Sequence, residues 1–184
     1  MKLLKMLKMK LENRSNFYLI NKPKTWTSQD LCSKFKYLYK FKKVGHAGTL
    51  DPNAEGLMLL ATDKYTKLFN YTKETDKTYK VSTLFGYSSD SIDTDTDVNK
   101  NEDVSLNDHL EELNKSMNTF LGSSMQKPPM YSAVKVDGKR LYKYARQGKE
   151  VDIPDREIHI SKFELLDVDG PKADFLITVS KGTY

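Results

Sequence analysis

One acidic side chain stands in a setting suited to chemistry: Asp51, within Gly48-Thr49-Leu50-Asp51-Pro52. A proline that follows an aspartate biases that aspartate toward an extended backbone. Glycines on both sides, Gly48 and Gly56, let the chain turn and let a ligand come close. A carboxylate presented on such a loop can be a nucleophile, a general base or a metal ligand. The same pattern also suits a turn aspartate that bonds its own backbone, so the loop alone leaves all four roles open.

Two other motifs do not fit the sites that they resemble at first sight. The alternating acidic segment 93–97 has the spacing of the start of a calcium loop, but the positions that an EF-hand reserves for Gly and Glu hold Val98 and Val104. Segment 45–48 has two glycines but lacks the Gly-Lys-Ser/Thr ending of a phosphate loop, and no G-x-G-x-x-G occurs in the sequence. We therefore expect a solvated acidic loop and no nucleotide cofactor.

Cysteine and histidine usage excludes further kinds of site. Cys32 is the single cysteine, which excludes an intrachain disulfide and an all-cysteine metal site. The three histidines, His46, His109 and His159, lie far apart and lack zinc-ligand spacing, so we expect no metal. His46 lies beside the Asp51 loop and could act as a base, although a lone loop histidine is more often structural.

The elements around Asp51 must position it. Segment 17–20 is apolar and precedes Asn21-Lys22-Pro23, which predicts a strand that ends in a turn. Either Thr27 or Ser28 could cap the helix that follows. The apolar residues of this helix have helical spacing and are Leu31, Phe35, Leu38 and Tyr39. Residues 45–56 contain three glycines and a proline, which exclude a regular helix, and they precede the buried-looking run 57–61.

The rest of the chain predicts short helices and strands in irregular alternation. We expect helices capped by Asp63 and by Ser105, the second with an apolar stripe from Leu106 to Leu121. We also expect a strand over 79–87 and an extended segment 132–136 that ends at the turn Asp137-Gly138. A helix over 141–145 should stop at Gly148. Strands should lie on both sides of the turn Asp169-Gly170-Pro171, the second of them continuing to Tyr184. This strand-rich pattern with hairpins predicts an α+β fold, without a domain linker.

Length and charge bound the class of protein. The chain has 184 residues, 38% of them hydrophobic and 30% charged, which fits one domain of ordinary size with a short appendage. The net charge of +5 is unevenly distributed, because residues 1–50 carry 12 Lys and Arg against 2 Asp and Glu, whereas the remainder carries 18 against 23. This asymmetry favours a polyanionic partner such as a nucleic acid, although solvated lysines alone would give the same count.

The N-terminal segment contains no secretory signal, because lysines interrupt residues 1–11 every two or three positions. No apolar run approaches the roughly 18 residues of a membrane span. The segment could be a basic amphipathic helix, a crude organelle presequence or a tail. We expect a basic tail over residues 1–16 and a cytoplasmic protein, with an organellar location as the alternative.

Segment 45–56, GHAGTLDPNAEG, resembles the catalytic motif of the TruB family of tRNA pseudouridine synthases. Other blocks are similar to further motifs of this family and keep their order: 21–23 with 27–28, 77–86, 126–135, 138–148 and 180–184. They extend over residues 17–184, which we expect to form the catalytic domain. The resemblance implies a pseudouridine synthase fold, with a mixed, mostly antiparallel central sheet, flanking helices and the active site in a cleft.

The resemblance also implies a reaction, the cofactor-free isomerisation of uridine to pseudouridine in RNA, at uridine 55 in the T loop of tRNA. Asp51 would be the nucleophile that assists cleavage of the N-glycosidic bond, after which the uracil rotates and its C5 joins the ribose C1′. The target base must be flipped out to be reached. In this reading Tyr79 stacks on the base, His46 helps to hold the flipped nucleotide, and Tyr184 lines the pocket.

The expected partner is the T-arm stem-loop of tRNA, bound by a monomer without a membrane or small-molecule cofactor. Lys22 and Pro23 are expected to be scaffold residues. The basic first fifty residues could supply phosphate contacts, since several of their lysines lead into the catalytic loop. These are Lys34, Lys36, Lys40, Lys42 and Lys43.

The sequence departs from the family pattern at several places. The family continues beyond the tyrosine matched by Tyr184 with an isoleucine-arginine pair, whose arginine pairs with the catalytic aspartate, and with an RNA-binding region that is often a PUA domain. Neither is present, so we expect a catalytic domain cut off inside its last motif and inactive or unstable alone. The family also often has glycine near Thr25, and its acidic loop is more regular than residues 88–97.

Two alternative functions remain. One is a dyskerin-type synthase that acts on sites selected by a guide RNA; the compact blocks 126–135 and 140–148 favour the stand-alone type instead. The other is a protein that binds and folds tRNA without chemistry. Retention of Asp51 and Tyr79 argues against this second alternative, and the missing arginine leaves it open.

Overall fold

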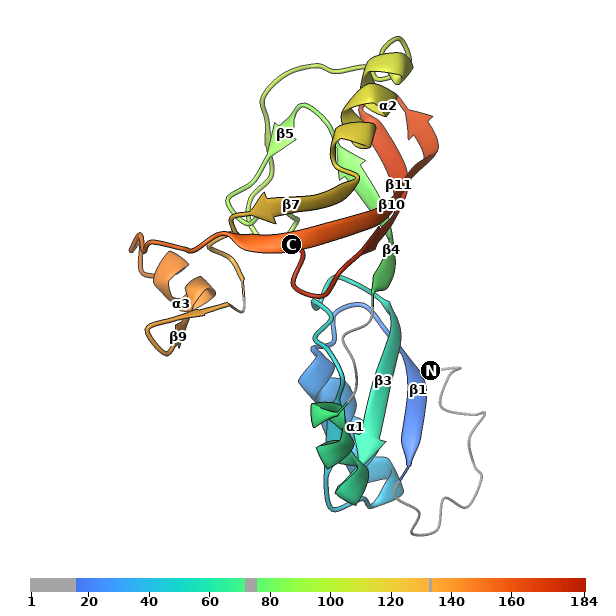
Figure 1. Ribbon diagram of the computed structural model, residues 1–184, viewed down its shortest axis with the longest axis vertical. Coiled ribbons are helices and arrows are strands. Elements are labelled where there is room, and N and C mark those ends of the chain that lie inside the picture. The colour runs from blue at the N-terminus through green and yellow to red at the C-terminus, as the bar shows by residue number, and fades with distance from the viewer. Residues whose placement is uncertain (1–15, 72–75, 133) are drawn as a thin grey trace. The chain divides into compact units, whose positions relative to one another are not determined.

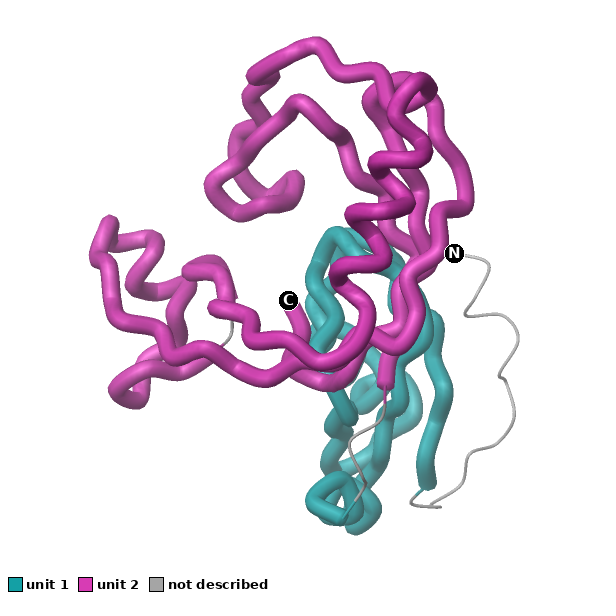
Figure 2. Tube along the Cα trace, turned by 45° about the horizontal axis from the view of Figure 1, so that its top comes forward, with its two compact units in different colours: residues 1–73 teal, residues 74–184 magenta. Residues whose placement is uncertain are grey.

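The computed structural model describes residues 16–71, 76–132 and 134–184. It divides the chain into two compact units, Met1–Lys73 and Glu74–Tyr184, here called unit 1 and unit 2 (Figures 1 and 2). Apart from Asn16, the predicted basic tail 1–16 lies outside the described residues. That residues 17–184 act as one catalytic domain stays a prediction. None of the helices in the described ranges is long and apolar enough to cross a membrane.

Within its described residues, unit 1 combines a three-stranded antiparallel sheet with two helices. The sheet has the order β1-β3-β2 and consists of β1 (Phe17–Lys22), β2 (Val44–His46) and β3 (Gly56–Thr62). The predicted strand at 17–20 is thus confirmed, and it pairs with β3, Tyr18 opposite Leu60. The run 57–61 is buried only in part, because Met58, Leu60 and Ala61 are buried whereas Leu57 is exposed. The helices are α1 (Ser28–Tyr39) and the 3-10 helix η2 (Asp63–Asn70). The core joins α1 to β3 and contains Leu31, Cys32, Phe35, Phe41, Met58 and Leu60.

The start of α1 is fixed by a reciprocal pair of hydrogen bonds. Thr27 is the N-cap, and its Oγ1 accepts from the Asp30 amide at 3.0 Å, while Asp30 Oδ2 accepts from the Thr27 amide at 3.0 Å. The Thr27 hydroxyl, which donates to Asp30 Oδ2 at 2.6 Å, and the Thr27 amide together lower the pKa of the Asp30 carboxyl. Of the two predicted caps, Thr27 is therefore the correct one. The neighbouring Ser28 hydroxyl does not cap the helix and bonds a loop instead.

Unit 2 is built on a four-stranded antiparallel sheet of order β4-β11-β10-β7. Its strands are β4 (Lys77–Leu84), β7 (Gly122–Gln126), β10 (Arg156–Asp169) and β11 (Lys172–Val179). Two short antiparallel ribbons and two helices complete the unit: β5 (Tyr87–Ser88) with β6 (Asn99–Lys100), β8 (Lys135–Val136) with β9 (Lys139–Arg140), α2 (Leu110–Thr119) and α3 (Leu141–Ala145). Within the described residues all strand pairings are antiparallel, and the predicted α+β class is confirmed.

Two predicted helix caps are wrong. α2 begins at Leu110 with His109 as N-cap, rather than after Ser105, because the Leu106 amide donates to Gly170 O at 2.9 Å and the Leu106 side chain is buried in the core of unit 2. Asp63 does not cap η2 either. It is the first residue of that helix, and its Oδ1 accepts from the Lys43 amide at 2.9 Å.

The last strand is also shorter than predicted. β11 ends at Val179, and a turn follows in which the Thr183 amide donates to Ser180 O at 3.4 Å. Gly182 has a φ of 95° in this turn, a backbone that an extended strand excludes. Tyr184 therefore follows a turn and does not lie in the strand.

Gly86 occupies the tightest backbone position of unit 2, and its replacement by Ala should be strongly destabilising. Its φ is 78°, and an added Cβ would lie 2.5 Å from Glu102 O. The left-handed backbone and the crowding should together lower the free energy of unfolding by about 2 to 5 kcal/mol. Gly170→Ala is the matched control, because Gly170 has a φ of 58° but no atom within 4 Å of an added Cβ. Urea denaturation should show the larger loss for Gly86→Ala; equal losses would contradict the steric reason.

Candidate active site

The loop that carries Asp51 connects β2 to β3 within unit 1. At its start the Ala47 amide donates to Leu59 O at 3.0 Å, and at its centre the Ala54 amide donates to Asp51 O at 3.1 Å, which closes a turn over residues 51–54. Three residues anchor this loop through hydrogen bonds: the last residue of β1, the first residue of α1 and one residue between these two elements. The Asp51 side chain is exposed.

Lys22 is the first of these holding residues. It ends β1 and is fully buried, with 0% of its surface exposed. Its Nζ donates to Pro23 O at 3.0 Å, to Trp26 O at 2.7 Å and to Pro52 O at 3.3 Å. The ammonium therefore uses three donors on three carbonyls, one of which follows Asp51 directly. These contacts agree with the predicted scaffold role of Lys22.

The charge of Lys22 also acts on the loop. Burial lowers the pKa of the Lys22 ammonium, while the carboxylates of Asp51 and Glu55 oppose this effect. The attraction is mutual, so the buried cation stabilises negative charge on the loop. An aspartate that acts as a nucleophile must be ionised, and Lys22 favours that state.

Ser28 is the second holding residue. Its Oγ accepts from the Leu50 amide and donates to Leu50 O, both at 2.9 Å, and only 4% of the residue is exposed. The first residue of α1 thus fixes the residue that precedes Asp51. The sequence predicts Ser28 as a possible helix cap and as part of the block 27–28 that resembles a family motif, but it does not predict this contact with the loop. Two adjacent hydroxyl residues, Thr27 and Ser28, could have indicated this contact, since only one hydroxyl is needed to cap the helix and the other can bond the loop.

Thr25 is the third residue that holds the loop, and its backbone is strained. Its amide donates to Pro52 O at 2.8 Å, and its φ is 71°, in the left-handed region that disfavours β-branched side chains. This position explains why a glycine suits the region around Thr25 better than threonine does.

Thr25→Gly should therefore stabilise the protein. Relief of the left-handed backbone should outweigh the added freedom of the unfolded chain, for a net gain of about 0.5 to 1 kcal/mol. Thr25→Ala keeps the Cβ and with it the strain, so it serves as the matched control. Urea denaturation midpoints should rise for the Gly variant only; a rise of equal size in the Ala variant would show that backbone strain is not the cause.

His46 ends β2 and is half-buried. Its Nδ1 lies 2.8 Å from Gly48 O, within the Asp51 loop. Because a carbonyl oxygen only accepts, Nδ1 must carry the hydrogen, and the neutral ring then presents Nε2 as an acceptor. This bond fixes both the tautomer and the orientation of the imidazole relative to the loop.

The other two predicted site residues belong to unit 2. Tyr79 lies on β4 opposite Ile177 and packs, partly buried, on a small core of β10 and β11. Tyr184 is 48% exposed, and Gln126 holds its backbone, accepting from the Tyr184 amide at 2.9 Å and donating to Tyr184 O at 2.6 Å. The register of the strands puts Tyr79 and Gln126 toward the same end of the four-stranded sheet.

Unit 1 thus brings together Lys22, His46 and Asp51, and unit 2 holds Tyr79 and Tyr184. Within the loop region of unit 1, an ionisable carboxylate, a buried cation and an oriented imidazole are available. This set can supply nucleophilic or general base chemistry without a metal.

Comparison with known proteins decides the family. The sequence model described as "TruB family pseudouridylate synthase (N terminal domain)" matches residues 36–184. The chain belongs to this family. Its TruB relatives include proteins named tRNA pseudouridine synthase B. The one from Psychrobacter arcticus is 43% identical over 175 residues, which cover 92% of this chain and 46% of the relative. The one from Lactobacillus acidophilus is 42% identical, covering 90% of this chain and 58% of the relative.

The chain therefore spans about half the length of the curated relatives that it matches. Among solved structures, it is similar to a Cbf5-Nop10-Gar1 complex, with a TM-score of 0.64 and 25% identity, covering 91% of this chain and 40% of the other. It also shares its fold with an H/ACA RNP bound to a substrate RNA containing 2'-deoxyuridine, with a TM-score of 0.61, 20% identity and coverage of 91% and 38%.

Proposed function

We propose that this protein isomerises uridine to pseudouridine in RNA, and that its target is uridine 55 in the T loop of tRNA. The observation that carries the proposal is the Asp51 loop: a family motif whose carboxylate is exposed and whose backbone is anchored through Lys22, Thr25 and Ser28. The identity of 43% to relatives named tRNA pseudouridine synthase B supports tRNA as the substrate.

In the proposed reaction the ionised Asp51 is the nucleophile. It assists cleavage of the bond between uracil N1 and ribose C1′, the detached uracil rotates, and its C5 forms the new bond to C1′. The hydrogen on C5 leaves as a proton, and N1 gains one, so that the reaction is a net isomerisation and needs no cofactor. Because this bond is inaccessible in a stacked loop, the nucleotide must first be flipped out.

The remaining site residues are assigned to substrate binding. His46 would contact the flipped nucleotide through Nε2, the acceptor left by the bond to Gly48 O. Tyr79 would stack on the base, and the half-exposed Tyr184 would line the pocket. We further propose that a monomer binds the T arm of tRNA in the cytoplasm.

Mapping of the product tests this function. An unmodified tRNA transcript is incubated with the protein, and pseudouridine is located by carbodiimide treatment and primer extension. We expect one new stop, at the T-loop uridine, without any guide RNA. A stop that requires a guide RNA would favour the dyskerin-type alternative, and tight tRNA binding without any stop would favour a protein that binds tRNA without chemistry.

A further inference from the structure

We propose that the C-terminal end of α1 forms a second RNA-contact surface, separate from the Asp51 loop, on which lysines bind phosphates and Tyr37 stacks against an unpaired base. This surface, here called the α1-end surface, consists of Lys34, Lys36, Tyr37, Leu38, Lys40 and Phe41. The proposal relies on the proposed function only for the identity of its ligand, RNA.

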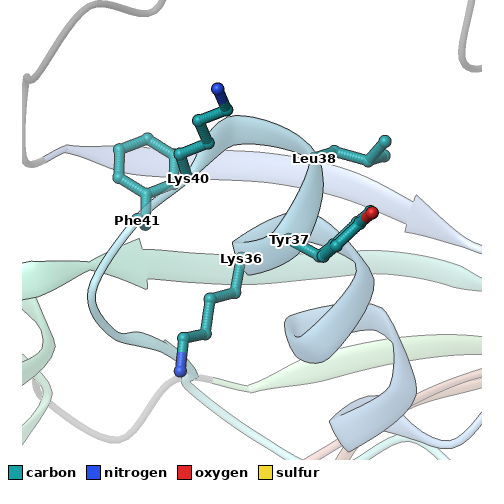
Figure 3. A pocket seen from close by; sticks show the side chains of 5 residues that line it. All are labelled: Lys36, Tyr37, Leu38, Lys40 and Phe41. Atoms are coloured by element: carbon teal, nitrogen blue, oxygen red, sulfur yellow. The ribbon is translucent and has the colours of Figure 1, made fainter.

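The α1-end surface is hollowed and has an exposed aromatic ring at its rim. The hollow is lined by Lys36, Tyr37, Leu38, Lys40 and Phe41 (Figure 3). Tyr37 is 80% exposed, whereas Phe41 is only 6% exposed and forms part of the core. Such an exposed ring contributes little to the packing of unit 1. It is available as a stacking platform for a base, which every nucleotide can use because each base has a π-face.

Two lysines lie three residues before and three residues after Tyr37. Residues three apart on a helix are neighbours, so Lys34 lies beside Tyr37 one turn earlier, and Lys40 is the C-cap of α1. The ammonium groups of Lys36 and Lys40 point away from each other in Figure 3, on opposite sides of the helix end. A strand whose base stacks on Tyr37 would therefore have a cation near the phosphate on either side. This combination of a ring and flanking cations is typical of surfaces that bind single-stranded nucleic acid.

The surroundings keep the positive charge uncompensated. Residues 31–50 contain five lysines and no aspartate or glutamate. Among the residues that the structure describes, none of these five side chains forms an ion pair. The acids that border this stretch are Asp30, whose carboxylate accepts from Thr27, and Asp63, whose carboxylate accepts from the backbone amide of Lys43. An anionic ligand would therefore meet no acidic side chain along this stretch of sequence.

The helix itself sets the spacing between the two sites. At 1.5 Å per residue, the nine residues from Ser28 to Tyr37 measure about 14 Å. Ser28 is bonded to Leu50 beside Asp51, so α1 is a rigid spacer between the catalytic loop and the α1-end surface. An RNA arm that delivers a base to Asp51 is long enough to contact both places.

Equilibrium binding of a fluorescently labelled T-arm RNA to the full chain, measured over a series of salt concentrations, tests the surface. Lys34→Gln, Lys36→Gln and Lys40→Gln combined should lower the slope of log Kd against log salt by about 2 to 3, as expected for three lost phosphate contacts. Tyr37→Ala should weaken binding about five-fold or more through loss of stacking, whereas Tyr37→Phe should bind as the parent does.

A matched control removes three lysines from unit 2: Lys100, Lys162 and Lys172, which pair with Asp103, Glu164 and Asp174. Their change to Gln should leave the slope within about 1 of the parent. The proposal is overturned by an unchanged slope and Kd in the α1-end variants, by an equal loss in the control, or by no binding of RNA to the parent. Pseudouridine formation by the parent is measured in parallel: binding without product refutes the proposed function alone, and product with unaffected variant binding refutes the surface alone.

Discussion

Replacement of Asp51 by Asn should abolish pseudouridine formation while leaving tRNA binding within about two-fold of the parent. Asn keeps the size and much of the hydrogen bonding of the side chain but cannot act as an anionic nucleophile. Removal of a nucleophile lowers kcat by about 10⁴-fold or more. The rate is measured as release of tritium from T-arm RNA labelled at uracil C5, and binding is measured by fluorescence anisotropy with the same RNA.

Asp169→Asn is the matched control for this experiment. Asp169 is an exposed acid at the end of β10, next to the hairpin turn, and the change is chemically identical. We expect it to leave the rate of tritium release unchanged. If Asp51→Asn retained more than about a tenth of the parent rate, or lost activity no more than Asp169→Asn did, Asp51 would not be the nucleophile.

Lys22→Met should damage both stability and activity. Methionine has a similar length but no donor, so the carbonyls of Pro23 and Trp26 would lose the Lys22 donor beside a buried side chain, while Pro52 O would keep only its bond from the Thr25 amide. Each unsatisfied buried group costs about 1 to 3 kcal/mol, and we expect the free energy of unfolding to fall by about 3 kcal/mol or more. The Asp51 loop would also lose one of its three anchors and the buried cation that attracts its carboxylates. A displacement of about 1 Å at a catalytic group can lower the rate 100-fold.

Lys24→Met provides the comparison, because Lys24 is exposed and lies two residues further along the same segment. Urea denaturation gives the stability of both variants, and tritium release is measured under conditions where circular dichroism shows that Lys22→Met is folded. Lys24→Met should resemble the parent in both measurements. Should Lys22→Met unfold at the same urea concentration as Lys24→Met and match its rate, the three carbonyl contacts would have no part in holding the loop.

Local patterns were enough to predict much of the fold. The cap at Thr27, the strand at 17–20 and the hairpin at Asp169-Gly170-Pro171 depend on residues close in sequence, and the structure confirms them. The helix expected after Ser105 failed for a long-range reason, since Leu106 is bonded to Gly170 O and buried against β11. No pattern within the segment 105–121 contains that contact. The helix therefore starts only after Leu106, at Leu110.

The candidate active site shows the same difference between local patterns and long-range contacts. The Asp51 loop is visible in the sequence because its glycines and proline are adjacent to the aspartate. The hydrogen bonds that anchor this loop are not visible in the sequence, because Lys22 and Pro52 are 30 residues apart and Ser28 and Leu50 are 22 apart. A sequence motif marks such residues without saying what they touch. The hydrogen on His46 Nδ1 likewise follows only from the distance to Gly48 O in the structure.

The most direct measurement of the central claim is release of tritium by the parent protein from T-arm RNA labelled at uracil C5. Formation of the bond between C5 and C1′ requires loss of the C5 hydrogen, so release reports the chemistry itself rather than binding. With protein in excess over RNA and no cofactor, metal or guide RNA added, we predict release of one tritium per target uridine. RNA that binds to the protein but keeps all of its tritium would contradict the claim that this chain is a pseudouridine synthase.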